Sequence, residues 1–189
     1  MAKTIKYDKE NLIEIKKSKF IGYTYFCENV ESATQILKNL KVLHKKATHV
    51  CYAYVINSNE KASDDGEPQG TAGVPILDVI KKQKLNNVLV VVVRYFGGVK
   101  LGAGGLVRAY SETASSTIEL SQSAEIVNAT DYRLIVNYGE ENTINSIKNN
   151  PSIIDVKINY SSNIQVEFTA INPVCINGAV VIGNRIIRV

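Results

Sequence analysis

Arg94 and Lys100 stand in a cluster of glycines that has the composition of an anion-binding turn. The segment from Arg94 to Arg108 reads RYFGGVKLGAGGLVR, and its glycines are Gly97, Gly98, Gly102, Gly104 and Gly105. In such a turn the backbone N–H groups can point outward, and the dipole of a following helix adds positive potential. We therefore predict that these glycines and the side chains of Arg94, Lys100 and Arg108 bind phosphate or another anion.

The same residues also have a structural explanation. The glycine spacing matches neither the Walker phosphate loop nor the dinucleotide fingerprint, so ATP and NAD have no direct support. Glycine could be required only for close packing in a tight strand–helix turn. The guanidinium of Arg94 could likewise form an internal salt bridge with one of three acidic residues, Asp64, Asp65 or Glu67. The sequence leaves ligand binding and packing as equal alternatives.

The acidic loop and His49 supply the remaining polar candidates. Asp64, Asp65 and Glu67 are too few, and wrongly spaced, for a calcium loop, so the DDG sequence is expected to form a turn. His49 begins a strand, and a lone histidine is more often structural than catalytic. We expect these four residues at the rim of the anion site, with no catalytic residue, no metal and no cofactor.

Composition limits the classes of protein to which the chain can belong. No window of its 189 residues approaches the roughly 18 apolar residues that a membrane span needs, and the N-terminus is too charged for a secretory signal. Three cysteines without a CxxC pair are typical of a reducing cytoplasm. The first 50 residues contain ten lysines against five acidic residues. Such a basic face can attract nucleic acid, although solvated surface lysines explain it equally well.

The elements that position these residues follow from hydrophobic periodicity. Within residues 1–125 we predict strands at 11–16, 19–27, 50–56 and 88–93, and helices from residue 31, at 75–85 and at 103–121. The valine run at 88–93 should be buried on both faces. Residues 57–73 are expected to form a long polar loop, of the length that is usually functional or disordered.

The rest of the chain predicts a second, smaller domain. Residues 122–130 are weakly patterned and polar, and we place the boundary there. Beyond it, a βαββαβ order predicts a ferredoxin-like sheet with helices on one face. Its strands are expected at 132–136, 153–160, 163–171 and 179–189, and its first helix at 140–148. The second helix, 172–178, contains Pro173 and is expected as either one turn or an irregular link.

These motifs together resemble the YigZ/IMPACT family. The resemblance rests on Asp64-Asp65-Gly66-Glu67-Pro68, Gly70-Thr71-Ala72-Gly73, Arg94-Tyr95-Phe96-Gly97-Gly98 and Leu101-Gly102. It implies an α+β protein with an N-terminal ribosomal-protein-S5-domain-2-like domain, residues 1–125, and a ferredoxin-like C-terminal domain, residues 131–189. These are similar to the fourth and fifth domains of elongation factor G. A role linked to RNA or the ribosome follows by fold analogy.

The leading hypothesis is a cytoplasmic, non-enzymatic protein that binds RNA or a ribosome-associated partner and is linked to translation regulation. The alternative is an enzyme that acts on a small phosphorylated or carboxylated substrate at His49, Asp64, Asp65, Glu67 and Arg94. A third reading is a protein–protein adaptor. A deep pocket lined by those five side chains would favour the enzyme, and an open basic groove reaching the lysines of residues 16–46 would favour RNA. An apolar patch on the C-terminal sheet would favour the adaptor. The oligomeric state stays open.

Overall fold

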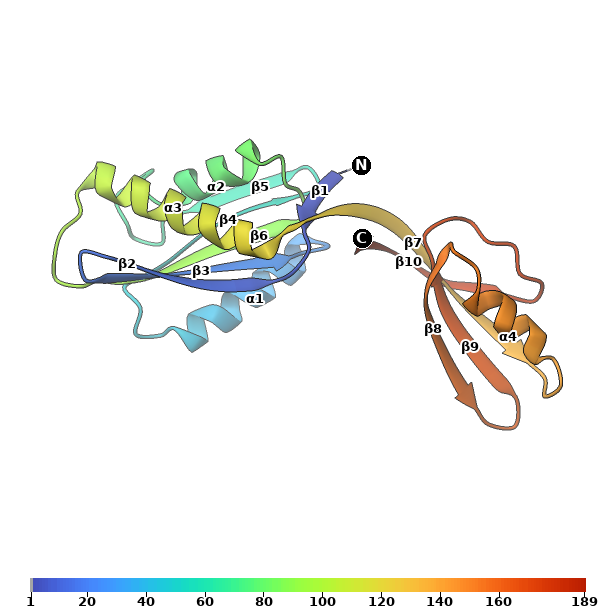
Figure 1. The fold of residues 1–189 in the computed structure, drawn as a ribbon. Helices are drawn as coiled ribbons and strands as arrows, with labels where there is room; N and C mark the ends of the chain where they lie inside the picture. Colours follow the sequence, from blue (N-terminus) through green and yellow to red (C-terminus); the bar gives the residue numbers. More distant parts are fainter. Residues whose placement is uncertain (1) are drawn as a thin grey trace. The chain divides into compact units, whose positions relative to one another are not determined.

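The computed structural model describes residues 2–189, which form two compact units. The N-terminal unit comprises Met1–Glu125 together with Arg188–Val189, and the C-terminal unit comprises Ile126–Ile187. Both units mix strands with helices, and Figure 1 shows the order of these elements along the chain. Among the described residues, no helix is both long enough and apolar enough to cross a membrane.

The N-terminal unit is built on a five-stranded antiparallel sheet with helices on both faces. The strand order is β2–β3–β6–β4–β5. Its strands are β2 (Lys9–Ile15), β3 (Ser18–Phe26), β4 (His49–Ile56), β5 (Asn59–Ser63) and β6 (Val88–Tyr95). Its helices are α1 (Val30–Leu43), α2 (Gly73–Lys82) and α3 (Ala103–Ser121). In Figure 1, α2 and α3 cover one face and α1 covers the other. A short strand, β1 (Ala2–Ile5), pairs with β7 (Ser123–Val136).

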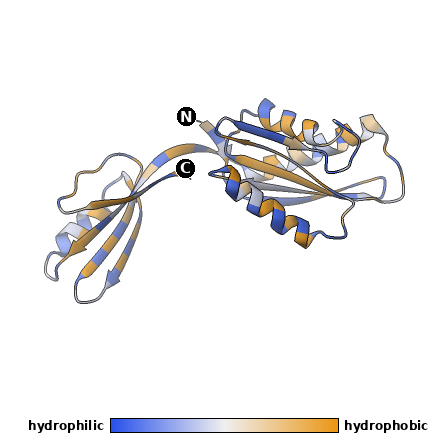
Figure 2. Ribbon diagram, turned by 180° about the vertical axis from the view of Figure 1, so that it is seen from behind, coloured by the Kyte–Doolittle hydropathy of each residue, from blue (hydrophilic) through white to orange (hydrophobic). Residues whose placement is uncertain are grey.

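The central strand β6 is buried on both faces, as its valine run predicts. Because side chains alternate along a strand, Val88, Val90 and Val92 pack into the core beneath α2 and α3. The intervening residues, Leu89, Val91 and Val93, pack into the core beneath α1. Figure 2 shows the middle strands of this sheet in the colour of apolar residues. The buried strand gives a rigid base to the polar residues at its end.

One prediction about an irregular segment is wrong, and one strand is longer than predicted. The polar loop expected at 57–73 contains a strand, β5, which pairs with β4 at the edge of the sheet. An edge strand is held by its backbone hydrogen bonds on one side, so it needs no apolar alternation. The strand expected from residue 132 begins earlier, at Ser123 in β7 (Ser123–Val136), and so includes most of the weakly patterned segment 122–130. The boundary between the two units falls in that segment, between Glu125 and Ile126. Apolar and polar residues alternate clearly only in the second half of β7, so the sequence predicted a strand that begins at residue 132.

The C-terminal unit has one helix over one face of an antiparallel sheet. Its elements are α4 (Glu141–Lys148), β8 (Ile153–Tyr160), β9 (Ile164–Ala170) and β10 (Val180–Arg188), with β7 between β10 and β9. Ile144 and Ile147 of α4 pack against Leu134, Val166 and Phe168. Residues 172–178, all described, contain no helix. Of the two expected outcomes for that segment, the irregular link is the one observed.

Candidate functional site

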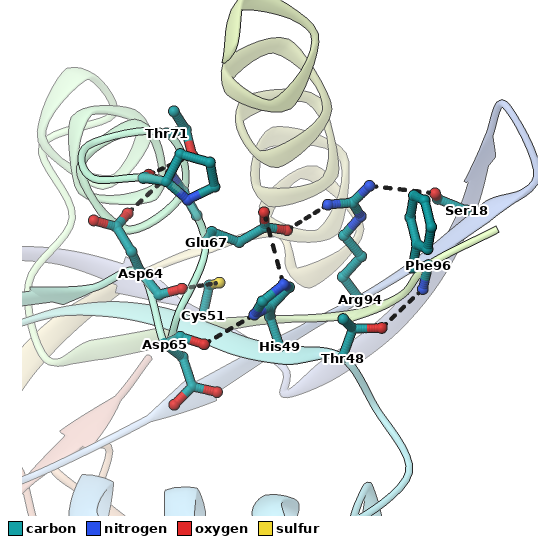
Figure 3. Close-up of polar contacts among 12 residues, drawn as sticks. Ser18, Thr48, His49, Cys51, Asp64, Asp65, Glu67, Thr71, Arg94 and Phe96 are labelled. Carbon is teal, nitrogen blue, oxygen red and sulfur yellow. Dashed lines mark hydrogen bonds and ion pairs between the residues drawn. The ribbon is translucent and has the colours of Figure 1, made fainter. Parts of the chain in front are cut away.

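Arg94 lies at the end of β6 and points into the protein. Its Nη1 donates a hydrogen bond to Oε1 of Glu67 at 2.7 Å, and its Nη2 lies 3.5 Å from Oγ of Ser18. Only 6% of the Arg94 side chain and 3% of the Glu67 side chain are exposed. Figure 3 shows the guanidinium between these two partners. The internal salt bridge is therefore the observed alternative, and Arg94 presents no free surface to a ligand.

Glu67 connects three separate elements through its carboxylate. Besides Arg94, it accepts a hydrogen bond from the Tyr110 hydroxyl on α3 at 2.8 Å. Burial raises the pKa of Tyr110, so its hydroxyl stays protonated and remains a donor. Nε2 of His49 lies 3.8 Å from Oε2 of the same carboxylate. Sequence reasoning missed Tyr110, since an aromatic residue at helical spacing reads only as core.

Asp64 and Asp65 are occupied by donors from the protein itself. Asp64 accepts hydrogen bonds from the backbone N–H groups of Gly70, Ala72 and Gly73, which lead into α2. Burial raises the pKa of Asp64, but these three N–H donors outweigh it and leave the pKa below its usual value. Asp65 accepts from the N–H of Val50 at 2.7 Å and from Nζ of a lysine on α1 at 2.7 Å. The DDG sequence thus organises a turn, as predicted.

His49 is partly accessible to solvent. Its side chain is 19% exposed. Its Nδ1 lies 2.9 Å from the backbone carbonyl oxygen of Asp65, an atom that can only accept, so Nδ1 carries a proton. Nε2 therefore faces the Glu67 carboxylate. Of the other four residues of the enzyme hypothesis, Glu67 and Arg94 are buried and paired with each other. Asp64 and Asp65 are only partly buried, with 27% of the Asp65 side chain exposed, and their carboxylates accept hydrogen bonds from the protein itself.

Three of the five glycines precede α3 and have two different roles. Gly97 packs against the turn between β2 and β3, where an added Cβ would lie 2.0 Å from the carbonyl carbon of Lys17. Its role is close packing, and its N–H donates to Ser18 Oγ at 3.1 Å. Gly98 and Gly102 have φ of 85° and 73°, and an added Cβ there would meet none of the described atoms within 4 Å. These two positions need glycine for backbone conformation.

The start of α3 carries the remaining predicted residues. Gly104 and Gly105 lie in its first turn, and no side chain in the described part of the chain caps that turn. Lys100 and Arg108 are exposed. Within residues 2–189 neither forms an ion pair, so both cations are free to meet an external anion. They are not, however, among the partners of the buried Arg94–Glu67 pair.

A basic, aromatic groove lies beside this cluster. It is an open hollow of about 470 Å³, lined by Lys17, Lys19, Ile21, Tyr95 and Phe96. Lys19 and Tyr95 are direct neighbours across the β3–β6 pair. We call these five residues the lysine–aromatic groove. The sequence did not indicate it, because its lysines and its aromatic residues are about 75 positions apart along the chain.

The two lysines at the tip of the β2–β3 hairpin adopt an unusual backbone conformation. Lys16 and Lys17 have φ of 47° and 65°, in the left-handed region that glycine and asparagine normally occupy. Lys17 lines the groove, and both side chains are exposed. Both central residues of a two-residue hairpin of type I′ have positive φ, so the turn imposes this conformation on the two lysines.

The groove continues towards the end of α1. His44, which follows α1, bridges the hydroxyls of Tyr23 and Tyr95 at 2.9 Å each, so the Tyr95 ring is held in place. Exposed Lys45 and Lys46 come directly after His44. Together with Lys17 and Lys19 of the groove, they make four exposed lysines. Across the described residues, none of these four lysines forms an ion pair.

The open face of the C-terminal sheet is polar. Arg133 pairs with Glu167 at 2.8 Å, and Arg185 pairs with Asp131 at 3.0 Å. A hollow of about 200 Å³ lies over these strands. Exposed apolar side chains cluster instead on the edge strand β10, at Val180, Val181 and Ile182. The open face is therefore largely polar, and the exposed apolar residues of this sheet to which the adaptor hypothesis refers are those on β10.

No cluster of three or more His, Cys, Asp or Glu residues within 2–189 has a geometry that could hold a metal ion.

Several known proteins are similar to this chain in sequence. Residues 16–118 match the Impact N-terminal domain. The IMPACT family member YvyE of Bacillus subtilis is 50% identical over 115 residues, which are 59% of this chain and 53% of YvyE. The IMPACT family member YigZ of Escherichia coli is 36% identical over 130 residues, 66% of this chain and 64% of YigZ. A Thermus thermophilus IMPACT family member is 38% identical over 133 residues, 70% and 73% of the two chains.

Two solved structures are also similar. One, described only as a hypothetical protein, is 28% identical and covers 89% of this chain and 84% of its own, with a TM-score of 0.64. The two-domain translational regulator Yih1 is 26% identical over 64% of this chain and 47% of its own, with a TM-score of 0.38. The first shares the fold over most of the chain. The second is too distant in shape to inform the present fold.

Proposed function

Because the chain belongs to the IMPACT family and carries a lysine-lined groove beside its central strand, we propose that it binds RNA without catalysing a reaction. The observation that carries this proposal is the lysine–aromatic groove, in which Lys17 and Lys19 stand beside the exposed ring of Phe96. Lysines without internal partners attract phosphates, and an aromatic ring gives a nucleobase a surface for contact. The buried Arg94–Glu67 pair then supports the groove through the contact of the Arg94 guanidinium with the Phe96 ring.

In this proposal, some of the residues predicted to contact an anion do so directly, and Arg94 does not. Lys100, Arg108 and the open glycines Gly98 and Gly102 remain candidates for phosphate contact at the start of α3. Arg94 acts indirectly, because its guanidinium is buried and already paired. Sequence-independent phosphate contact predicts binding without strict sequence preference.

The proposal extends to ribosomal RNA and to translation. The ribosome is the largest store of exposed RNA in a cell, so an RNA-binding protein of moderate basicity meets it often. A cytoplasmic location and a link to translation regulation are parts of the same proposal. The finer fold assignments are proposals too; the strand order β10–β7–β9–β8 supports a ferredoxin-like C-terminal unit that lacks its second helix.

Salt dependence of binding tests the proposal directly. A labelled RNA of about 12 nucleotides would be titrated with the full chain between 50 and 200 mM salt, concentrations over which phosphate contacts weaken steeply. We expect the double variant Lys17→Gln/Lys19→Gln to bind about 20-fold more weakly near 0.1 M salt and to show a salt slope smaller by about 1.4. Affinity that is flat with salt would contradict the proposal.

A matched variant controls for net charge. Lys82 and Lys84 are also exposed, but they lie at the end of α2, on the sheet face opposite to the groove. Lys82→Gln/Lys84→Gln changes the net charge by the same amount and should leave most of the affinity intact. Equal losses in the two double variants would show that total charge, and not the groove, governs binding.

A further inference from the structure

We infer that Phe96 is a stacking platform for an unpaired nucleobase, so that the lysine–aromatic groove takes single-stranded RNA in preference to duplex. This inference rests on the proposed function and names its substrate class. Phe96 is 47% exposed although it directly follows a strand whose first seven residues are buried. A large aromatic side chain left half in water beside unpaired lysines is the composition of a single-strand binding surface.

The Phe96 ring is held in place from below. The Arg94 guanidinium carbon lies 5.4 Å from the centroid of the Phe96 ring and 5.4 Å from the centroid of Phe20. Because Glu67 and Ser18 fix the guanidinium, the ring rests on a rigid support. Figure 3 shows Arg94 and Phe96 next to each other at the end of the strand.

The backbone of Phe96 is fixed as well. Its N–H donates a hydrogen bond to Oγ1 of Thr48 at 3.0 Å. A ring held by both its backbone and its inner face loses little conformational freedom when a base stacks on its exposed side. The adjacent cation also draws electron density inward, which favours contact between the outer face and an electron-rich base. Arg94 is therefore a positioning residue for Phe96.

The geometry of the groove favours a single strand. Lys17 and Lys19 line the same hollow as Phe96, so a phosphate and its neighbouring base can be contacted together. Its volume, about 470 Å³, lies within the range of ordinary small-ligand sites and is enough for one nucleotide. In a duplex the bases are stacked inside the helix, and a ring at the protein surface cannot reach their faces.

Removing the bases while keeping the phosphates tests this inference. Wild-type protein would be titrated with three probes: a single-stranded RNA, the same strand with abasic residues along its length, and its duplex. We expect the single strand to bind about tenfold more tightly than the abasic strand. Phe96→Leu should abolish that difference, and Phe96→Tyr should preserve it. Tyr160→Leu, which removes another exposed aromatic ring, is the control.

The possible results separate this inference from the proposed function. Equal binding of the normal and abasic strands, or an unchanged preference in Phe96→Leu, overturns the stacking platform while salt-dependent binding through the lysines survives. Tighter binding of the duplex overturns it too. If no probe binds in a lysine-dependent manner, the proposed function itself fails. Thermal unfolding of each variant shows whether it is folded, and the comparison of strands on the wild-type protein decides the question even if Phe96→Leu does not fold.

Discussion

The two strained lysines of the β2–β3 hairpin offer a test in which stability and binding should move in opposite directions. In the double variant Lys16→Asn/Lys17→Gly, the turn receives the Asn-Gly pair that two-residue hairpins of this geometry prefer. Glycine at position 17 has no β-carbon and adopts a φ of 65° without a steric clash, and asparagine at position 16 adopts a φ of 47° more readily than lysine does. The backbone contact of this turn with Gly97 is unchanged, because it involves main-chain atoms of residue 17.

The expected stabilisation follows from two opposing terms. A left-handed conformation costs a non-glycine residue about 1–2 kcal/mol, so two such residues cost roughly 2–4 kcal/mol. Asparagine at position 16 removes only part of the cost of the left-handed conformation there. Glycine at position 17 makes the unfolded chain more flexible, which lowers the stability of the folded state by about 0.4–1 kcal/mol. We expect a net gain near 1 kcal/mol, or about 4 °C in the melting temperature of the N-terminal unit.

Binding should fall in the same variant. Lys17 is the one of the two lysines that lines the groove, so its removal should lower the salt slope by about 0.7 and weaken RNA binding about 5-fold near 0.1 M salt. Differential scanning calorimetry and RNA titration on one preparation give both quantities. A loss of stability would show that the lysine side chains make structural contacts, and unchanged affinity would remove the hairpin from the binding site.

Four further results are expected. Gly97→Ala should destabilise the N-terminal unit by about 2 kcal/mol in urea unfolding, because its new methyl group would overlap the hairpin backbone; a neutral effect would mean that the hairpin moves freely. Glu67→Ala should cost about 3–5 kcal/mol, since it leaves the buried charge of Arg94 without a partner; a loss below about 1 kcal/mol would show that this guanidinium reaches water. Asp64→Asn should have a lower free energy of unfolding than wild type at pH 7. This difference should narrow as the pH falls below 3.8, the ordinary aspartate pKa, because a carboxylate whose pKa is lowered in the folded state contributes stability only while it is ionised. A difference in stability that does not change with pH would contradict this. In native protein a thiol reagent should label Cys175 alone at pH 8, since it is exposed while burial raises the pKa of the other two thiols; rapid reaction of a second thiol would reveal local opening.

Much of the fold follows from local pattern. The valine run of β6 and the small residues of α3 have burial signatures that need no knowledge of distant partners, so their boundaries are predicted within two residues. The glycine cluster and acidic loop are likewise visible as sequence motifs. β5 is not, because a short edge strand is stabilised by pairing with β4 and not by its own composition.

The sequence by itself determined that Arg94 ends a buried strand, and that either an internal acid or an external anion must meet its charge. Only the tertiary structure decided between them, because choosing Glu67 requires the acidic loop, β6 and α3 to converge. The lysine–aromatic groove has the same origin. Its residues meet through the register of β3 against β6, which pairs Lys19 with Tyr95, and no local pattern encodes a contact between positions so far apart along the chain.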